Sequence, residues 1–125
     1  MEKSDFTLRI LIVEDEALIA SSLALSLEEA GCHVTVAYDG QEGFERAIEL
    51  QSDLIITDYM MPRMNGLDLI VELRANGLKM PIILMTSLPQ RNLPKTAAGY
   101  NAFLSKPFDE ETLLQLIKKQ TARSQ

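Results

Sequence analysis

Along the chain, the pattern of apolar and polar positions alternates between two periodicities. Five short segments are continuously apolar or alternate with a period of two, as β-strands do: residues 8–13, 33–37, 54–57, 81–85 and 102–104. Four segments between them repeat apolar residues every three or four positions, as amphipathic helices do: residues 16–30, 40–50, 65–75 and 110–120. Gly31 and Gly77 follow two of these helical segments, where glycine commonly ends a helix.

Alternating strands and helices are typical of an α/β fold, in which helices pack on both faces of a sheet. Residues 8–13, 54–57 and 81–85 are apolar almost throughout, as expected for parallel strands covered on both sides. Right-handed crossovers bring the carboxyl ends of all parallel strands to one edge of the sheet. In doubly wound sheets ligands bind at that edge, so the residues directly after the strands are the candidates for function.

One stretch departs from this regular alternation. Residues 87–101 contain Pro89 and Pro94, and a proline inside a helix costs about 3 kcal/mol. A short turn that begins with Pro94 and ends at Gly99 fits this stretch better than one long helix. The sequence therefore predicts a doubly wound, five-stranded parallel sheet with an irregular or shortened fourth helix.

Length, charge and composition limit the class of protein. A chain of 125 residues with 46% hydrophobic residues is expected to form one globular domain, with its core over about residues 8–120. The net charge of −6 argues against direct nucleic-acid binding and suits a divalent cation or a basic partner. The chain has neither a signal peptide nor an apolar run of roughly 18 residues, so we expect a cytoplasmic protein without membrane insertion. The single cysteine, Cys32, allows no intrachain disulfide and is expected to be a part-buried side chain.

Polar side chains follow four of the five predicted strands. Glu14 and Asp15 come after the first strand, Asp58 after the third, Thr86 after the fourth and Lys106 after the fifth. Because these strand ends share one edge, three carboxylates, a hydroxyl and an ammonium group are expected to converge. Clustered carboxylates favour a divalent cation, and oxygen-only ligands favour Mg²⁺. The ammonium and hydroxyl groups suit a phosphoryl group, which an aspartate can itself accept as nucleophile.

Four segments carry a family resemblance that extends over almost the whole chain. They are LRILIVEDEALIA, LIITDYMMPRMNGLDLI, PIILMTS and FLSKPF. In this order, each at a strand end, they resemble the receiver domain of bacterial response regulators. The resemblance implies a flavodoxin-like sheet with strand order 2-1-3-4-5. It also implies Mg²⁺ as cofactor and a sensor histidine kinase or histidine phosphotransfer protein as the phosphoryl donor.

The resemblance further implies roles for residues near the metal. Asp58 matches the phosphoacceptor and is also a metal ligand. Asp15 matches the direct Mg²⁺ ligand, and Glu14 matches the neighbouring acid that acts through water. The backbone carbonyl of Met60 matches the remaining protein ligand of the metal.

Residues of the fourth and fifth strands match the groups that respond to phosphorylation. Thr86 matches the hydroxyl residue that moves toward the phosphoryl group, and Lys106 matches the charge partner of that group. Phe103 occupies the position of the switch aromatic, where tyrosine is commoner. Pro107 is expected to fix the following turn, with a cis Lys106–Pro107 bond as one way to do so. Simpler interpretations stay open: Asp15 as a helix cap, Thr86 as a strand-end hydroxyl, Lys106 as a surface charge and Phe103 as a core residue.

In this family, the side chains two residues beyond the phosphorylated aspartate and beyond the hydroxyl residue help to set the rate of phosphate loss. Here they are Met60 and Leu88, and both are apolar. Neither can hydrogen-bond an attacking water, so the resemblance implies a long-lived phosphoryl group.

Three functions fit these residues. The first is a stand-alone receiver, a phosphoacceptor and not a turnover enzyme. Only TARSQ follows the last predicted helix, so we expect it to signal through a downstream protein, as a monomer or weak homodimer.

The second is a receiver-like adaptor that binds proteins independently of phosphorylation, which the irregular stretch 87–101 would suit. The third is a metal-dependent phosphohydrolase, which Met60 disfavours because it stands where such enzymes carry a general acid. Flavin binding is a possibility of the fold only, because the sequence has no glycine- or hydroxyl-rich loop after the first strand to hold a phosphate.

Overall fold

The computed structural model describes residues 7–93 and 99–122. Within them lie five strands: β1 (Arg9–Val13), β2 (His33–Ala37), β3 (Leu54–Asp58), β4 (Ile82–Thr86) and β5 (Ala102–Ser105). The α-helices are α1 (Ala17–Glu29), α2 (Gly40–Leu50), α3 (Gly66–Ala75) and α4 (Glu110–Ala122), and a 3₁₀ turn, η2, covers Gln90–Asn92. Each strand and α-helix lies within one or two residues of its predicted bounds. None of these helices is both long and apolar enough to cross a membrane.

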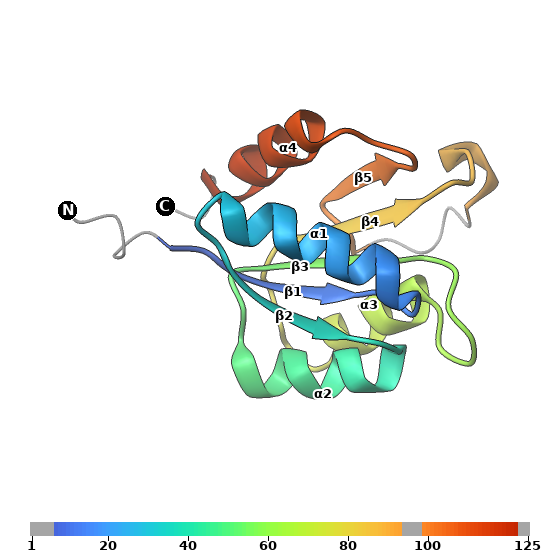
Figure 1. Cartoon of the computed structure of the whole chain (residues 1–125). Coiled ribbons are helices and arrows are strands. Elements are labelled where there is room, and N and C mark those ends of the chain that lie inside the picture. The colour runs from blue at the N-terminus through green and yellow to red at the C-terminus, as the bar shows by residue number, and fades with distance from the viewer. Residues whose placement is uncertain (1–6, 94–98, 123–125) are drawn as a thin grey trace.

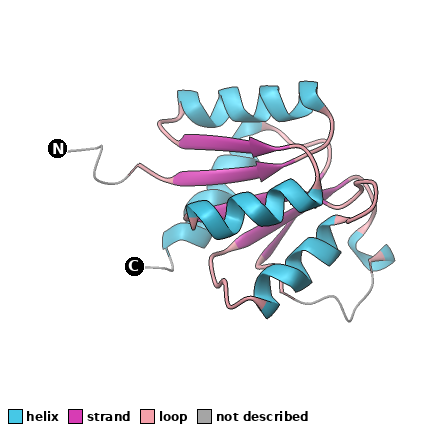
Figure 2. Ribbon diagram, turned by 90° about the horizontal axis from the view of Figure 1, so that it is seen from below, coloured by secondary structure: helices cyan, strands magenta, loops and turns pink. Residues whose placement is uncertain are grey.

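The five strands form one parallel sheet in the order β2-β1-β3-β4-β5 (Figure 1). This confirms the flavodoxin-like order that the resemblance implies. Helices lie on both sides of the strands (Figure 2). The order reverses between β1 and β3, and a doubly wound sheet binds its ligand at the carboxyl ends of such strands.

The core is divided in two because successive side chains of a strand point to opposite faces. Ile10 and Ile12 of β1 pack on the side of α1 and α4, whereas Leu11 and Val13 pack on the side of α2 and α3. All residues of β3 and β4 are buried. This double coverage explains why these strands are continuously apolar up to the polar residue that ends each of them.

Between β4 and β5, the only helical element within 87–93 and 99–101 is η2. The N–H of Asn92 donates to the carbonyl of Pro89 over 2.9 Å and closes this turn. Leu93, which follows it, is buried against the α2–α3 side of the core. Within these described residues, the prediction of an irregular or shortened fourth helix is therefore confirmed. The predicted turn beginning at Pro94 lies outside the described residues, and Gly99 has a φ of +126°, a conformation that glycine readily adopts.

The start of β5 is fixed by Arg74 at the end of α3. A guanidinium has five N–H donors, and here every one is used, over distances of 2.7–3.0 Å. The acceptors are the carbonyl oxygens of Leu78, Met80 and Gly99 and the Oδ1 of Asn101. Asn101 in turn pairs with Ile82, donating its N–H to the carbonyl and accepting the Ile82 N–H on Oδ1, each over 2.8 Å. Arg74 thus joins the loop before β4 to the residues before β5.

Candidate functional site

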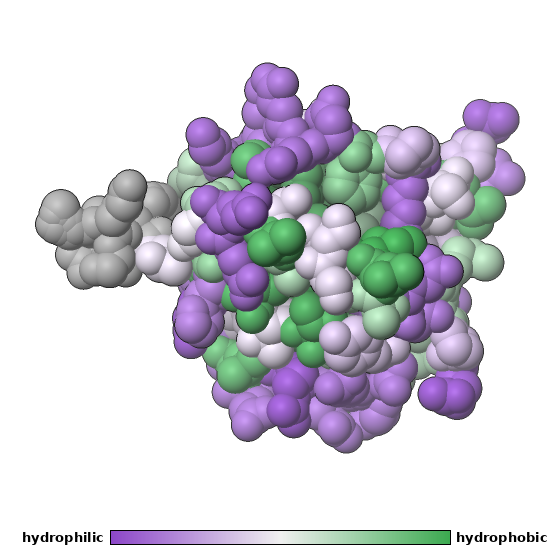
Figure 3. Space-filling model, in the orientation of Figure 1, coloured by the Kyte–Doolittle hydropathy of each residue, from purple (hydrophilic) through white to green (hydrophobic). Residues whose placement is uncertain are grey.

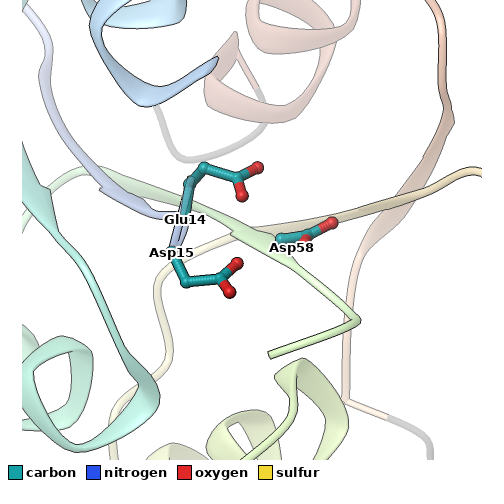
Figure 4. Close-up of side chains that lie close together, drawn as sticks. All are labelled: Glu14, Asp15 and Asp58. Carbon is teal, nitrogen blue, oxygen red and sulfur yellow. The ribbon is translucent and has the colours of Figure 1, made fainter. Parts of the chain in front are cut away.

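Three carboxylates meet at the carboxyl ends of β1 and β3 (Figure 4). Glu14 and Asp15 follow β1 directly, and Asp58 is the last residue of β3. One carboxylate oxygen of each residue lies within 4.8 Å of the others. In Figure 4 the side chains of Glu14 and Asp15 extend toward the side on which Asp58 lies. The structure thus brings together the three acids that the sequence predicts at this edge.

Lys106 connects two of these carboxylates. Its Nζ lies 2.9 Å from Oδ1 of Asp58 and 3.2 Å from Oε1 of Glu14. The Lys106 side chain is 21% exposed, that of Asp58 is 7% exposed and that of Glu14 is fully buried. The Lys106–Pro107 peptide bond is cis, and the N–H of Lys106 donates to the carbonyl of Thr86 over 2.9 Å. Lys106 is therefore a paired, largely covered cation, which corrects the alternative of a solvated surface charge.

The two neighbouring acids have different surroundings. Both carboxylate oxygens of Glu14 are engaged, one by Lys106 and the other by the N–H of Glu16 over 3.1 Å. Asp15 is exposed. Glu16 is the N-cap of α1, which has no side-chain capping bond, so the alternative of Asp15 as a helix cap is wrong. Asp15 is the acid of this pair that an approaching cation can reach from solvent.

The backbone around Asp58 depends on close packing with the start of α3. A Cβ at Gly66 would collide with the carbonyl oxygen of Asp58. Gly66 donates its N–H to the carbonyl of Tyr59 over 2.9 Å, and Tyr59 donates its own N–H to the carbonyl of Met85 over 2.9 Å. Asn65 and Asp68 cap α3 with reciprocal hydrogen bonds. These contacts fix the backbone on which the Asp58 carboxylate is presented.

Burial and charge act against each other at this site. Burial raises the pKa of Asp58, and Asp15 adds to this rise, while Lys106 opposes it. Burial also raises the pKa of Glu14, against the hydrogen bond from Glu16. For Lys106 burial lowers the pKa, but the bonds and charges of Asp58 and Glu14 outweigh it and raise the value overall. The site therefore disfavours its own negative charge, and a bound cation would relieve this.

The donor set fits Mg²⁺. It consists of carboxylate oxygens, the ligands that this ion prefers beside the waters it retains. Across residues 7–93 and 99–122, these three acids are the only group of three or more His, Cys, Asp or Glu side chains close enough to share an ion.

The remaining predicted residues lie around this cluster. Thr86 is buried at the end of β4, and its Oγ1 accepts the N–H of Leu88 over 3.1 Å. Phe103 is half-buried on β5 and packs against the α2–α3 side of the core. The side chain of Met60 is 60% exposed in the loop after β3. The switch and ligand roles of these residues stay predictions.

A groove of about 320 Å³ runs between α1 and the start of α4. Its lining includes Leu18, Ile19 and Ser22 of α1, and Phe108, Glu110 and Leu113 from the other side. Leu18 is 87% exposed. Figure 3 shows several exposed apolar side chains, in green, among paler ones on the face that carries α1. An apolar surface thus begins next to the loop that holds Glu14 and Asp15.

The family model of the response regulator receiver domain matches residues 10–118. The chain belongs to this family. The receiver domain of Francisella response regulator 1452 has 28% identity and a TM-score of 0.88, over 95% of this chain and 100% of that one. Response regulator TrrA of Thermotoga maritima, solved in complex with Mg²⁺-BeF, has 29% identity and a TM-score of 0.84, over 91% of this chain and 99% of that one.

Curated relatives of this receiver are longer. Transcriptional regulatory protein PdtaR of Mycobacterium tuberculosis is 41% identical over 92% of this chain and 57% of its own length. Transcriptional regulatory protein DltR of Streptococcus agalactiae is 34% identical over 94% of this chain and 53% of its own length. The chain thus spans about half the length of the curated relatives it matches.

Sequence reasoning did not find the bond between Glu14 and Lys106 or the role of Arg74. The strands that carry Glu14 and Lys106 are separated in the sheet by β3 and β4, so only the strand order together with the reach of the lysine could have indicated this bond. For Arg74 the one signal is its place at the end of a helix, before a loop whose carbonyls need donors.

Proposed function

We propose that this receiver accepts a phosphoryl group on Asp58 from the phosphohistidine of a sensor kinase or a histidine phosphotransfer protein. The observation that carries the proposal is the position of the Asp58 carboxylate, which lies 2.9 Å from Lys106 and beside the acids of β1. A nucleophilic carboxylate with a cation beside it is what transfer to aspartate requires.

The reaction is a displacement at phosphorus. An oxygen of Asp58 attacks, the bond between phosphorus and the histidine nitrogen breaks, and the imidazole leaves with the electron pair. Lys106 exchanges part of its contact with Asp58 for the incoming phosphoryl oxygens, and the Thr86 hydroxyl donates a hydrogen bond to one of them. Asp15, Asp58 and the Met60 carbonyl would hold Mg²⁺ directly, with Glu14 acting through water. When bound, the ion supplies positive charge against the charge of the phosphoryl oxygens.

The product is a signalling state. Met60 carries no proton-transferring group, so Asp58 has no general acid two residues later to support turnover of free substrates. The phosphorylated protein would act on a downstream protein partner. The groove between α1 and α4 begins near the loop of Glu14 and Asp15, and it suits docking of the donor protein. This function implies a cytoplasmic protein.

The test is phosphorylation by a small donor. The whole chain is incubated with Mg²⁺ and acetyl phosphate, and the phosphoryl group is located by mass spectrometry. Asp58→Asn should abolish its incorporation. Asp53→Asn is a matched control, since Asp53 is an exposed aspartate directly before the start of the same strand, and it should leave incorporation unchanged. Incorporation into Asp58→Asn at the wild-type rate contradicts the assignment, and a wild-type chain that is never phosphorylated favours the adaptor instead.

A further inference from the structure

Met60 differs from the other methionines in its exposure. The chain has six methionines, and the structure describes all but the first. Met60 is 60% exposed, whereas Met61 is 8% exposed and Met85 is fully buried. Met64 and Met80 are half-buried. Among the described methionines, Met60 is thus the thioether that a solute reaches most easily.

The loop holds Met60 in this exposed position. Tyr59 on one side is fixed by hydrogen bonds to Met85 and Gly66, each of 2.9 Å. Met61 on the other side is part of the core that α2 and α3 cover. Met60 lies between these two held residues, with its side chain in solvent two residues beyond Asp58.

We propose that Met60 is an oxidation site at which a hydroperoxide shortens the lifetime of the phosphoryl group on Asp58. The sulfur lone pair attacks one peroxide oxygen, a sulfur–oxygen bond forms and the oxygen–oxygen bond breaks. Sulfur loses two electrons and the peroxide gains them. One oxygen of hydrogen peroxide stays on sulfur, and the other takes up the proton of the first and leaves as water. The product, methionine sulfoxide, can be reduced again by sulfoxide reductases, so the change is reversible.

The expected consequence follows from the change in polarity. A thioether is only a weak hydrogen-bond acceptor, and an apolar side chain two residues after Asp58 does not hold an attacking water. A sulfoxide is polar, and its oxygen accepts hydrogen bonds strongly. It can hold a water beside the aspartyl-phosphate and so speed hydrolysis. This inference rests on the proposed function, because it concerns the phosphorylated state of Asp58.

The experiment has two independent readouts. The whole chain is treated with hydrogen peroxide in a Cys32→Ser background, which removes the competing thiol, and the methionines are followed by peptide mass spectrometry. Sulfoxide should form at Met60 several-fold faster than at Met61 or Met85. The treated protein is then phosphorylated with acetyl phosphate and Mg²⁺, and its phosphoryl group should decay several-fold faster than before treatment.

Two variants of residue 60 complete the test. Met60→Leu keeps an apolar side chain without sulfur, so its decay rate before and after peroxide should be the same. Met60→Gln places a polar oxygen there and should decay faster than wild type without any peroxide. The inference is overturned if Met60 oxidises no faster than Met61, or if its oxidation leaves the decay rate unchanged. Failure of the proposed function is a different result, in which the untreated protein takes up no phosphoryl group at Asp58.

Discussion

Lys106 stands between two carboxylates, with its Nζ 2.9 Å from Oδ1 of Asp58 and 3.2 Å from Oε1 of Glu14. Lys106 follows β5, which is adjacent to neither β1 nor β3 in the sheet. Its ammonium group therefore links the end of the fifth strand to the ends of the first and the third. Both carboxylates are buried. The lysine that is proposed to support phosphoryl transfer therefore also balances charge in the resting protein.

Removing this lysine should destabilise the metal-free protein. Lys106→Met leaves two buried carboxylates without their cation, and breaking a buried pair in this way costs about 3 kcal/mol. Saturating Mg²⁺ should restore part of the loss, because the ion supplies the missing positive charge. Urea unfolding with EDTA or with Mg²⁺ measures both effects. Lys118→Met, at an exposed position of α4, is the control, and an equal loss of stability in both variants would argue against the charge-balancing role.

The two acids after β1 should contribute unequally to Mg²⁺ affinity. Asp15 is exposed to an arriving ion, whereas both oxygens of Glu14 are already held by Lys106 and the N–H of Glu16. Asp15→Asn should weaken binding by about tenfold or more, and Glu14→Gln by less, because it removes only support around the ligands. Titration calorimetry gives both constants. Equal losses would contradict the assignment of Asp15 as the direct ligand.

The stability of the metal-free protein should depend on pH through Asp58. Its pKa is raised by burial, so the folded state binds this proton more tightly than the unfolded state does. The stability contributed by the proton is present below the ordinary pKa and is lost as pH rises through the raised value. Asp58→Asn cannot lose a proton, so its stability relative to wild type should increase as pH rises from about 4 to about 7.

Urea unfolding in EDTA across this pH range tests the sign. Saturating Mg²⁺ should remove the advantage of Asp58→Asn at neutral pH, because the ion stabilises the ionised wild-type carboxylate. A variant whose relative stability falls with rising pH in EDTA would show that Lys106 outweighs burial at Asp58.

Strand geometry explains why much of the site could be predicted. An apolar run that ends in Asp58, and another that ends in Thr86, indicate both the strands and the edge at which these side chains emerge. The exact ends were less predictable, and β3 and β4 each extend to include that polar residue. Directly after β3, the N–H of Tyr59 donates to the carbonyl of Met85 in β4. No local pattern in the sequence reveals this contact.

Contacts between distant segments could not be predicted in this way. The partners of Arg74 are mainly backbone carbonyls, which every residue possesses and which leave no trace in the sequence. An arginine in the last turn of a helix is equally typical of a solvated surface. The same applies to Glu14 and Asp15, which are adjacent acids with no local feature to show which one is buried.

Arg74 gives a prediction about stability. Arg74→Lys replaces five donors with three, so at least two of the hydrogen bonds to Leu78, Met80, Gly99 and Asn101 are lost. A hydrogen bond to a charged group contributes about 1.5–3 kcal/mol, so a destabilisation of about 3 kcal/mol is expected. Urea unfolding checks it, with Arg91→Lys at an exposed position of η2 as control. Equal stability of Arg74→Lys and wild type would mean that these bonds are replaced by water without loss.

The hydroxyl of Thr86 should couple the site to the segment after β4. Its Oγ1 accepts the N–H of Leu88 over 3.1 Å, so the group proposed to bind a phosphoryl oxygen also holds the first turn of residues 87–93. Pro89 interrupts regular helical hydrogen bonding there, and we expect these residues to be among the least protected of the described chain. The hydroxyl can donate to the phosphoryl group while its oxygen still accepts the N–H of Leu88, so fixing it there would shift these residues toward a more ordered state.

Hydrogen exchange with and without beryllofluoride and Mg²⁺ measures this coupling. Residues 87–93 should gain protection when the mimic binds, whereas residues 99–101 should change little, because Arg74 already holds them. Thr86→Val removes the acceptor, so the Leu88 amide should exchange faster in the free protein, and residues 87–93 should lose their response to the mimic. Strong protection of residues 90–93 before activation, or a full response in Thr86→Val, would show that the signal leaves the site by another route.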